Sequence, residues 1–344
     1  MRGIYTAAYL DALDTAYSKR RQIPCGLDIG KGFQLIVGTS TGAIIGCALA
    51  IGTAPAKVLE LYRRHGAEVF PKKLPSRFGY DLLTQLRTRP VYLKKGEKAL
   101  CSELEKLLQT ARLADVWNTR HIALAITAVN MSTYRSWVFK TPQDPCTTHR
   151  DDDRTLVDVC LASSAAPLYR SLAVLKHERT ETYNVFADGG LWANNPVIVA
   201  LVEALQMVSH TDEDIEIFSL GSCGKPEGEV IPPQKRHRSL TDWKLGGGAA
   251  AVSIAAQEFA FENIARLLCP HLKNNVRIIR FPSEKIPAAM LKYLDLDETR
   301  RDGLDALVQQ ARADADMTNS RVYQQTDDAR AIGDVFNTIP PRVV

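Results

Sequence analysis

The fold of this chain is decided by the stretch Leu35-Ile-Val-Gly-Thr-Ser-Thr-Gly-Ala-Ile-Ile-Gly46. Its three leading aliphatic residues predict a buried strand, and the apolar run over 43–51 predicts a buried helix. Between them, residues 38–42 match the pattern G-x-S-x-G, with Ser40 at the turn. A serine on a sharp turn from strand to helix is typical of a nucleophile elbow, where a strained backbone lifts the hydroxyl above the sheet edge.

Two glycines flank this serine. We expect Gly38 and Gly42 to be required because a side chain at either position would stop strand and helix from passing closely. The helix that follows Ser40 offers free N–H groups and the positive end of a dipole, which favour a developing anion.

Strands alternate with helices along the rest of the chain, which predicts an α/β sandwich of three layers around a mainly parallel central sheet. No linker or composition break divides the 344 residues. We therefore expect one domain over 1–344, with a motif-bearing core over about 2–225 and a C-terminal strand and helices over about 246–318 packing on it. The predicted strands cover 35–37, 122–129, 136–140, 182–187, 215–220 and 276–281, and the predicted helices cover 3–21, 43–51, 55–66, 100–108, 156–163, 196–205, 246–268 and 299–318.

Two basic segments interrupt this pattern. Residues 67–95 are interpreted as irregular, with lysines and arginines among aromatic residues, and residues 225–245 are polar and rich in proline. Each is either a solvated connection or a surface that contacts anionic lipid headgroups or a nucleotide phosphate.

Composition limits the class of protein. The net charge of +4 is too small to indicate binding to a nucleic acid polymer. The seven cysteines form no C-x-x-C pair, which fits a reducing, cytoplasmic compartment. No signal peptide follows Met1, and the uncharged window 33–52 is broken by the G-T-S-T-G turn, so we expect no membrane span. We also expect no metal and no resident cofactor.

A serine hydroxyl needs a positioned base to act as a nucleophile at neutral pH. A Ser-His-Asp triad would take a late histidine, namely His210, His237 or His271, but that fold places its elbow after several strands, and here only one helix and one strand precede Ser40. The alternative base is Asp188, which ends a predicted strand and precedes Gly189 and Gly190. A direct Ser-Asp dyad would need desolvation and strong oxyanion stabilisation to compensate for a weak base.

An early G-x-S-x-G followed by D-G-G about 150 residues later resembles the patatin-like phospholipases. Supporting segments are Arg2-Gly3-Ile4, Ala162-Ser-Ser-Ala-Ala-Pro167 and Asp188-Gly-Gly-Leu-Trp-Ala-Asn-Asn-Pro196. The similarity covers about residues 2–225. Val138-Phe-Lys-Thr-Pro142 is most similar to the CapV-type bacterial branch, whose members are phospholipases activated by a cyclic dinucleotide in CBASS antiphage defence.

The resemblance implies hydrolysis of membrane phospholipid esters through an acyl-enzyme, with Ser40 as nucleophile and Asp188 as base. It also implies oxyanion donors at Arg2, Gly3 and Thr41, a cyclic dinucleotide as activator, and peripheral contact with the inner face of the membrane. It leaves an oligomer open.

The family pattern begins with a strand and then D-G-G-G-x-R-G, of which Met1-Arg2-Gly3 matches only the last three positions. Either the start is assigned too late or the chain is truncated. As written, we expect it to lack the first strand and the glycine-rich oxyanion loop, and to be impaired. Two alternative functions follow: a Ser-His-Asp esterase acting on small esters, and a non-catalytic sensor of lipid or nucleotide.

Overall fold

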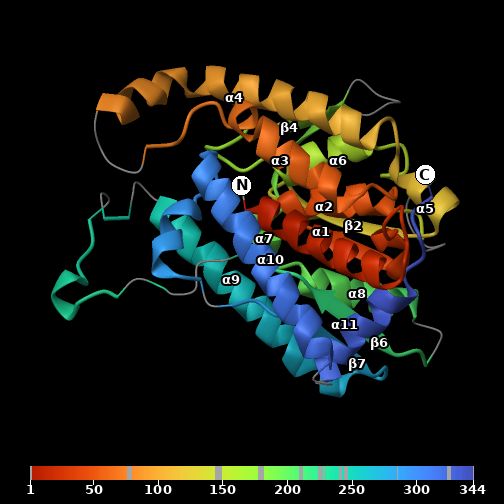
Figure 1. Cartoon of the computed structure of the whole chain (residues 1–344). Helices are drawn as coiled ribbons and strands as arrows, with labels where there is room; N and C mark the ends of the chain where they lie inside the picture. The colour runs from red at the N-terminus through yellow and green to blue at the C-terminus, as the bar shows by residue number, and fades with distance from the viewer. Residues whose placement is uncertain are drawn as a thin grey trace.

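The computed structural model of the chain describes residues 2–75, 80–143, 149–176, 182–208, 212–223, 228, 230–239, 242–243, 247–284, 286–323 and 327–343. The α-helices are α1 (Gly3–Arg20), α2 (Thr41–Ala50), α3 (Pro55–Val69), α4 (Tyr80–Leu108), α5 (Leu113–Arg120), α6 (Leu156–Ser163), α7 (Gly190–Ala193), α8 (Val197–Met207), α9 (Gly247–Leu268), α10 (Arg301–Tyr323) and α11 (Asp327–Thr338). The strands are β1 (Leu35–Gly38), β2 (Ala123–Asn130), β3 (Arg135–Lys140), β4 (Ala173–Lys176), β5 (Tyr183–Asp188), β6 (Ile215–Ser219) and β7 (Val276–Arg280). Helices and strands are interspersed along the chain, as in an α/β protein, but they do not alternate strictly, because α2 to α5 follow one another and so do β2 and β3 (Figure 1).

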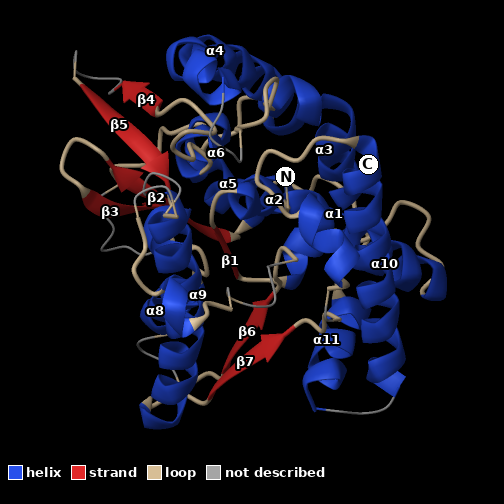
Figure 2. Ribbon diagram, turned by 90° about the vertical axis from the view of Figure 1, so that its left-hand side faces the viewer, coloured by secondary structure: helices blue, strands red, loops and turns tan. Residues whose placement is uncertain are grey.

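The strands form two groups, with helices on both sides (Figure 2). A five-stranded group has the order β1-β2-β5-β4, with β3 paired to β2, and β6 pairs with β7 in a second group. The expectation of a mainly parallel sheet is not confirmed. Among the described strands, β1–β2 and β6–β7 are parallel, whereas β2–β3, β2–β5 and β4–β5 are antiparallel.

Two strands meet end to end along one edge of β2. β3 pairs with residues 125–130 of β2 and therefore occupies one edge of β2. Other strands that pair with these residues lie along the opposite edge of β2. There β1 reaches Ile126, and β5, running the other way, ends opposite Ala128. Both strands therefore stop beside Thr127, and the residues that follow them come together at that point.

The main core lies where α1, α2 and α3 pack together, with α10 laid along α1 (Figure 1). Two buried tyrosines of α1 bind α10 through their hydroxyls: Tyr5 donates to Asp314 at 2.5 Å, and Tyr9 pairs with Thr318. These bonds satisfy polar groups that would otherwise be buried without a partner. No helix within the described residues is both long enough and apolar enough to cross a bilayer.

Most predicted elements are confirmed to within a few residues, but one segment is wrong and four elements were not predicted. Residues 80–95, expected to be irregular, form the first half of α4, which continues through Pro90 and packs on α3. Pro90 disfavours a helix interior locally, whereas lysine and arginine are good helix formers, and packing on α3 supports the helix through the proline. The short strand β4 and the helices α5, α7 and α11 were not expected, because their apolar patterns are brief.

Candidate active site

Ser40 occupies the sharp turn between β1 and α2. Its backbone has φ 56° and ψ −119°, a strained conformation for a residue other than glycine. A Cβ on Gly38 would lie 2.6 Å from the carbonyl oxygen of Gly42, so the predicted need for glycine at position 38 is confirmed. For Gly42 the predicted reason is wrong, because a Cβ there would meet no atom within 4 Å.

The base candidate Asp188 contacts this serine directly. Ser40 Oγ donates a hydrogen bond to Asp188 Oδ2 at 2.7 Å, and the backbone N–H of Gly190 donates to Asp188 Oδ1 at 2.6 Å. Burial raises the pKa of Asp188 to about 6, although the hydrogen bonds from Ser40 and Gly190 and the charge of Arg170 act to lower it. A carboxylate with this pKa is a stronger base than an exposed one and is still ionised at neutral pH.

Thr127 of β2 fixes the space between the two strand ends. Its hydroxyl pairs with that of Thr39 at 2.7 Å. A Cβ on Gly189 would lie 2.2 Å from Thr127 Oγ1 and 2.4 Å from its carbonyl oxygen, so only glycine permits this approach. The glycine after the base thus has a steric function, whereas Gly190 supplies a hydrogen bond.

The segment 162–167 holds both strand ends from the other side. Ser163, fully buried at the end of α6, accepts a hydrogen bond from the backbone N–H of Ser40 at 2.8 Å. Its carbonyl oxygen accepts one from Gly189, and that of Ala165 accepts one from Asp188. The sequence analysis used this segment only as a mark of resemblance. Its role depends on a contact across 123 residues, for which no local pattern exists.

The candidate oxyanion donors also lie here. Thr41 is the first residue of α2, so its N–H is among those that find no partner inside the helix. A Cβ on Gly3 would lie 2.6 Å from Thr41 Cβ, and Arg2 lines the same cavity as Ser40. The structure therefore places Gly3 against Thr41, the residue after Ser40, and places Arg2 in the wall of the same cavity.

Ser40 and Asp188 open into a cavity of about 1450 Å³. This volume exceeds that of typical small-molecule sites, and much of the wall is apolar. Apolar lining residues come from helices α3, α4 and α9 and from strand β6, and include Leu61, Val69, Leu100, Ile254 and Phe218. A long acyl chain is compatible with this volume and lining.

Histidine is not placed to act as the base within the described residues. No described histidine lines the cavity, and His237 and His271 lie on other parts of the surface. His210 lies outside the described residues. In the part of the chain that the structure covers, no three histidine, cysteine or acidic side chains are grouped so as to hold a metal ion.

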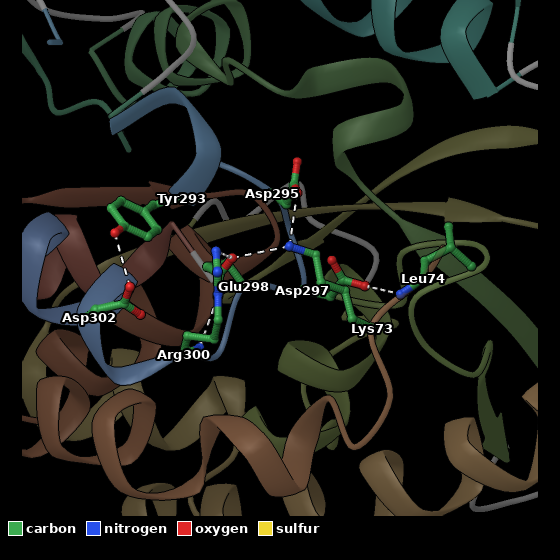
Figure 3. A network of polar contacts seen from close by, with 8 residues as sticks. All are labelled: Lys73, Leu74, Tyr293, Asp295, Asp297, Glu298, Arg300 and Asp302. Carbon is green, nitrogen blue, oxygen red and sulfur yellow. Dashed lines mark hydrogen bonds and ion pairs between the residues drawn. The ribbon is translucent and has the colours of Figure 1, made fainter. Parts of the chain in front are cut away.

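A charged cluster joins two segments of the cavity wall (Figure 3). Lys73 Nζ lies 3.0 Å from Asp295 Oδ2 and 3.1 Å from Glu298 Oε2, and the N–H of Leu74 donates to Asp297. Arg300 completes the cluster with an ion pair to Glu298 at 2.8 Å. Lys73, one of the basic residues expected to meet a phosphate, is therefore engaged within the protein. Within 225–245, residues 228, 230–239 and 242–243 are described, and Lys235 and Arg236 of the basic cluster in this segment are exposed.

Comparison with known proteins gives a consistent result. Residues 1–201 match the family model described as "Patatin-like phospholipase". A protein from Vibrio cholerae named "cGAMP-activated phospholipase" is 28% identical over 90% of this chain and 86% of its own length. A protein of the same name from Escherichia coli is 30% identical over 76% of this chain and 71% of its own. Among solved structures, VipD from Legionella pneumophila matches with a TM-score of 0.32 and 12% identity, over 91% of this chain and 65% of that one.

Proposed function

Since this chain belongs to the patatin-like phospholipase family, we propose that it hydrolyses acyl esters of membrane phospholipids through a Ser40–Asp188 dyad. The observation that carries the proposal is the hydrogen bond of 2.7 Å from Ser40 Oγ to Asp188 Oδ2 at the wall of a large apolar cavity. The cavity accommodates the acyl chain, and the dyad supplies nucleophile and base.

The reaction has two halves. Ser40 Oγ attacks the ester carbonyl and its proton passes to Asp188, while the N–H of Thr41 stabilises the oxyanion. The tetrahedral intermediate collapses, the C–O bond to the lysolipid breaks, and Asp188 returns the proton to the leaving alkoxide. Water, deprotonated by Asp188, then attacks the acyl-enzyme, and Ser40 recovers its proton as the fatty acid leaves. Arg2 and Gly3 add to the oxyanion site from the start of α1.

Two finer parts of the proposal concern control and place of action. We propose that a cyclic dinucleotide activates the enzyme, which the names of the Vibrio cholerae and Escherichia coli relatives support, and that the enzyme acts in bacterial antiphage defence. We also propose peripheral contact with the inner face of the membrane. Exposed apolar side chains on α9, including Val252, Phe259 and Leu267, support such contact, because lipid-surface helices carry apolar residues on one face.

The test is release of fatty acid from phosphatidylglycerol and phosphatidylethanolamine vesicles, with and without a panel of cyclic dinucleotides. We expect release that depends on a nucleotide and is lost in Ser40→Ala and in Asp188→Asn. Release without any nucleotide would retain the hydrolase and remove the activator. No release under any condition, with the protein folded and bound to vesicles, would favour a non-catalytic lipid sensor.

A further inference from the structure

Arg170 is a buried cation without a hydrogen-bonded partner at its Nε. It lies in the loop after α6, where its backbone N–H donates to Ala166 at 2.8 Å. Its side chain lines the cavity that contains Ser40 and Asp188, and the residue is only 6% exposed. Guanidinium groups are rarely buried unless they are paired, because desolvation of the charge is costly. The position of Arg170 therefore needs an explanation.

The charges around Arg170 do not supply that partner. Burial lowers the pKa of Arg170 to about 10, and the nearby Glu97, Asp188 and Tyr62 act in the opposite direction through coulombic interactions. Asp188 already uses both oxygens, one for Ser40 and one for Gly190. The buried Nε atom has no acceptor.

A second unpartnered donor lies in the same wall. Tyr62 on α3 is 3% exposed, lines the cavity, and has no hydrogen-bond partner at its hydroxyl. That hydroxyl lies 3.0 Å from the point where a Cβ on Gly3 would sit, and Thr41 Oγ1 lies at the same distance from this point. Tyr62 thus brings one unsatisfied donor close to the N-terminus of α2, and Arg170, whose charge interacts with Tyr62 and Asp188, brings a second donor to the wall of the same cavity.

We infer that Arg170 and Tyr62 form an anion-binding subsite of the cavity, which receives the phosphodiester of the phospholipid substrate. Guanidinium groups bind phosphate oxygens with strong, charge-assisted hydrogen bonds, and a phenol adds a neutral donor. The ligand would satisfy groups that the fold leaves unpaired, and it would fix the ester near Ser40. This inference rests on the proposed function, since it identifies the substrate class that the dyad acts on.

Two other roles of Arg170 predict different results in the experiments below. The guanidinium could hold the carboxylate of the fatty acid product, which has similar oxygen chemistry. It could instead be a positioning residue that acts through Asp188, because its charge lowers the pKa of that carboxyl.

The first experiment compares kcat/KM for a short-chain phosphatidylglycerol with kcat/KM for a p-nitrophenyl ester of the same acyl chain, which lacks phosphate. In Arg170→Gln we expect the ratio of the two values to fall roughly 10- to 100-fold, the size typical of a lost charge-assisted hydrogen bond. Arg170→Lys should recover part of the ratio, and Tyr62→Phe should lower it by a smaller factor. The matched control is Arg280→Gln, which removes a cavity-lining arginine that already pairs with Glu262.

An unchanged ratio in Arg170→Gln overturns the inference. If both substrates slow equally and the acid limb of the pH profile moves to higher pH, Arg170 is a positioning residue for Asp188. Thermal unfolding of each variant separates these results from a failure to fold, and Arg170→Lys keeps the charge if Arg170→Gln does not fold.

The second experiment measures binding without turnover. Isothermal titration of Ser40→Ala with glycerophosphoglycerol and with octanoate should show that adding Arg170→Gln weakens the phosphodiester at least about tenfold and octanoate less. The opposite order assigns Arg170 to the product carboxylate and overturns the inference. If the wild-type protein hydrolyses neither ester, the proposed function fails, and this titration still decides whether the anion site exists.

Discussion

Ser40 and Asp188 are 148 residues apart in the sequence, yet Ser40 Oγ lies 2.7 Å from Asp188 Oδ2. The reason is the arrangement of β1 and β5, which approach each other along one edge of β2 and stop on either side of Thr127. The dyad is built from two strand ends and is held by the loop that follows α6. Several consequences of this arrangement can be measured.

The buried carboxylate should cost stability. Because burial raises the pKa of Asp188 to about 6, ionisation disfavours the folded state as pH rises from about 4 through 6. Asp188→Asn should therefore be inactive. At pH 7 its free energy of unfolding should equal that of wild type or exceed it by up to about 3 kcal/mol. The gain should vanish near about pH 4, where Asp188 is protonated or nearly so in both states. Urea unfolding at the two pH values checks this, and a large loss of stability at pH 7 would contradict it.

The same pKa sets the pH dependence of catalysis. Asp188 accepts a proton only when ionised, so kcat/KM for a soluble ester should fall on the acid side with an apparent pKa of about 6. The measurement is a pH–rate profile on a p-nitrophenyl ester, with stability followed at each pH. A profile that is flat through pH 6 would show that Asp188 is not the base.

The two glycines of the elbow should respond differently to alanine. Gly38→Ala places a Cβ 2.6 Å from a backbone oxygen and should lower Tm or prevent folding. Gly42→Ala meets nothing within 4 Å and lies in the first turn of α2, so its Tm should equal or exceed that of wild type. Each variant is the control for the other. Equal losses of stability would contradict this account of the turn.

Ser163 should matter to both stability and rate. Ser163→Ala removes the acceptor for the part-buried N–H of Ser40, which should cost about 1–3 kcal/mol. It should also lower kcat, because the turn that carries the nucleophile loses a fixed contact. Ser164→Ala is the matched control, since that hydroxyl donates to Cys160 within the same helix end. If the two variants have the same kcat, the role assigned to Ser163 is wrong.

The charged cluster between residues 73–74 and 295–300 should stabilise the cavity wall. Glu298 is 1% exposed; burial acts to raise its pKa, but Arg300 and Lys73 outweigh this and lower it to about 2. Its contribution is therefore complete above its ordinary pKa of about 4.5 and is lost as pH falls towards 2.

Glu298→Gln should destabilise the protein by about 1–3 kcal/mol at pH 7 and by less at low pH. Arg301→Gln, which removes one side of an exposed pair with Asp305, should have almost no effect. Chemical denaturation of both variants at neutral and acid pH makes the comparison. A loss for Glu298→Gln that does not depend on pH would rule out the ionic explanation.

The sequence predicted the elements around Ser40 and Asp188 because their signals are local. An aliphatic run, a G-x-S-x-G turn and a strand ending in D-G-G need no distant contact to be recognised. The antiparallel entry of β5 was not predicted, because strand direction depends on how the chain returns to β2. Arg170, Tyr62 and Ser163 were missed for a similar reason: each acquires its role from a partner or a cavity formed by other elements.

Some expectations remain predictions. The single-domain organisation, the oxyanion role of Arg2, Gly3 and Thr41, and the activator each depend on experiments rather than on patterns. For α4 the local pattern was misleading. Pro90 and many basic residues suggested an irregular segment, but packing on α3 supports a helix there.

The central claim, that Asp188 activates Ser40, is tested most directly by the rate of labelling with a fluorophosphonate probe. The rate is followed against pH in wild type, Ser40→Ala, Asp188→Asn and His210→Ala, and the labelled peptide is identified by mass spectrometry. We expect the label on Ser40, a rate that falls on the acid side with an apparent pKa of about 6, loss of labelling in Asp188→Asn, and wild-type labelling in His210→Ala. Wild-type labelling of Asp188→Asn together with loss in His210→Ala would contradict the account and establish a histidine base.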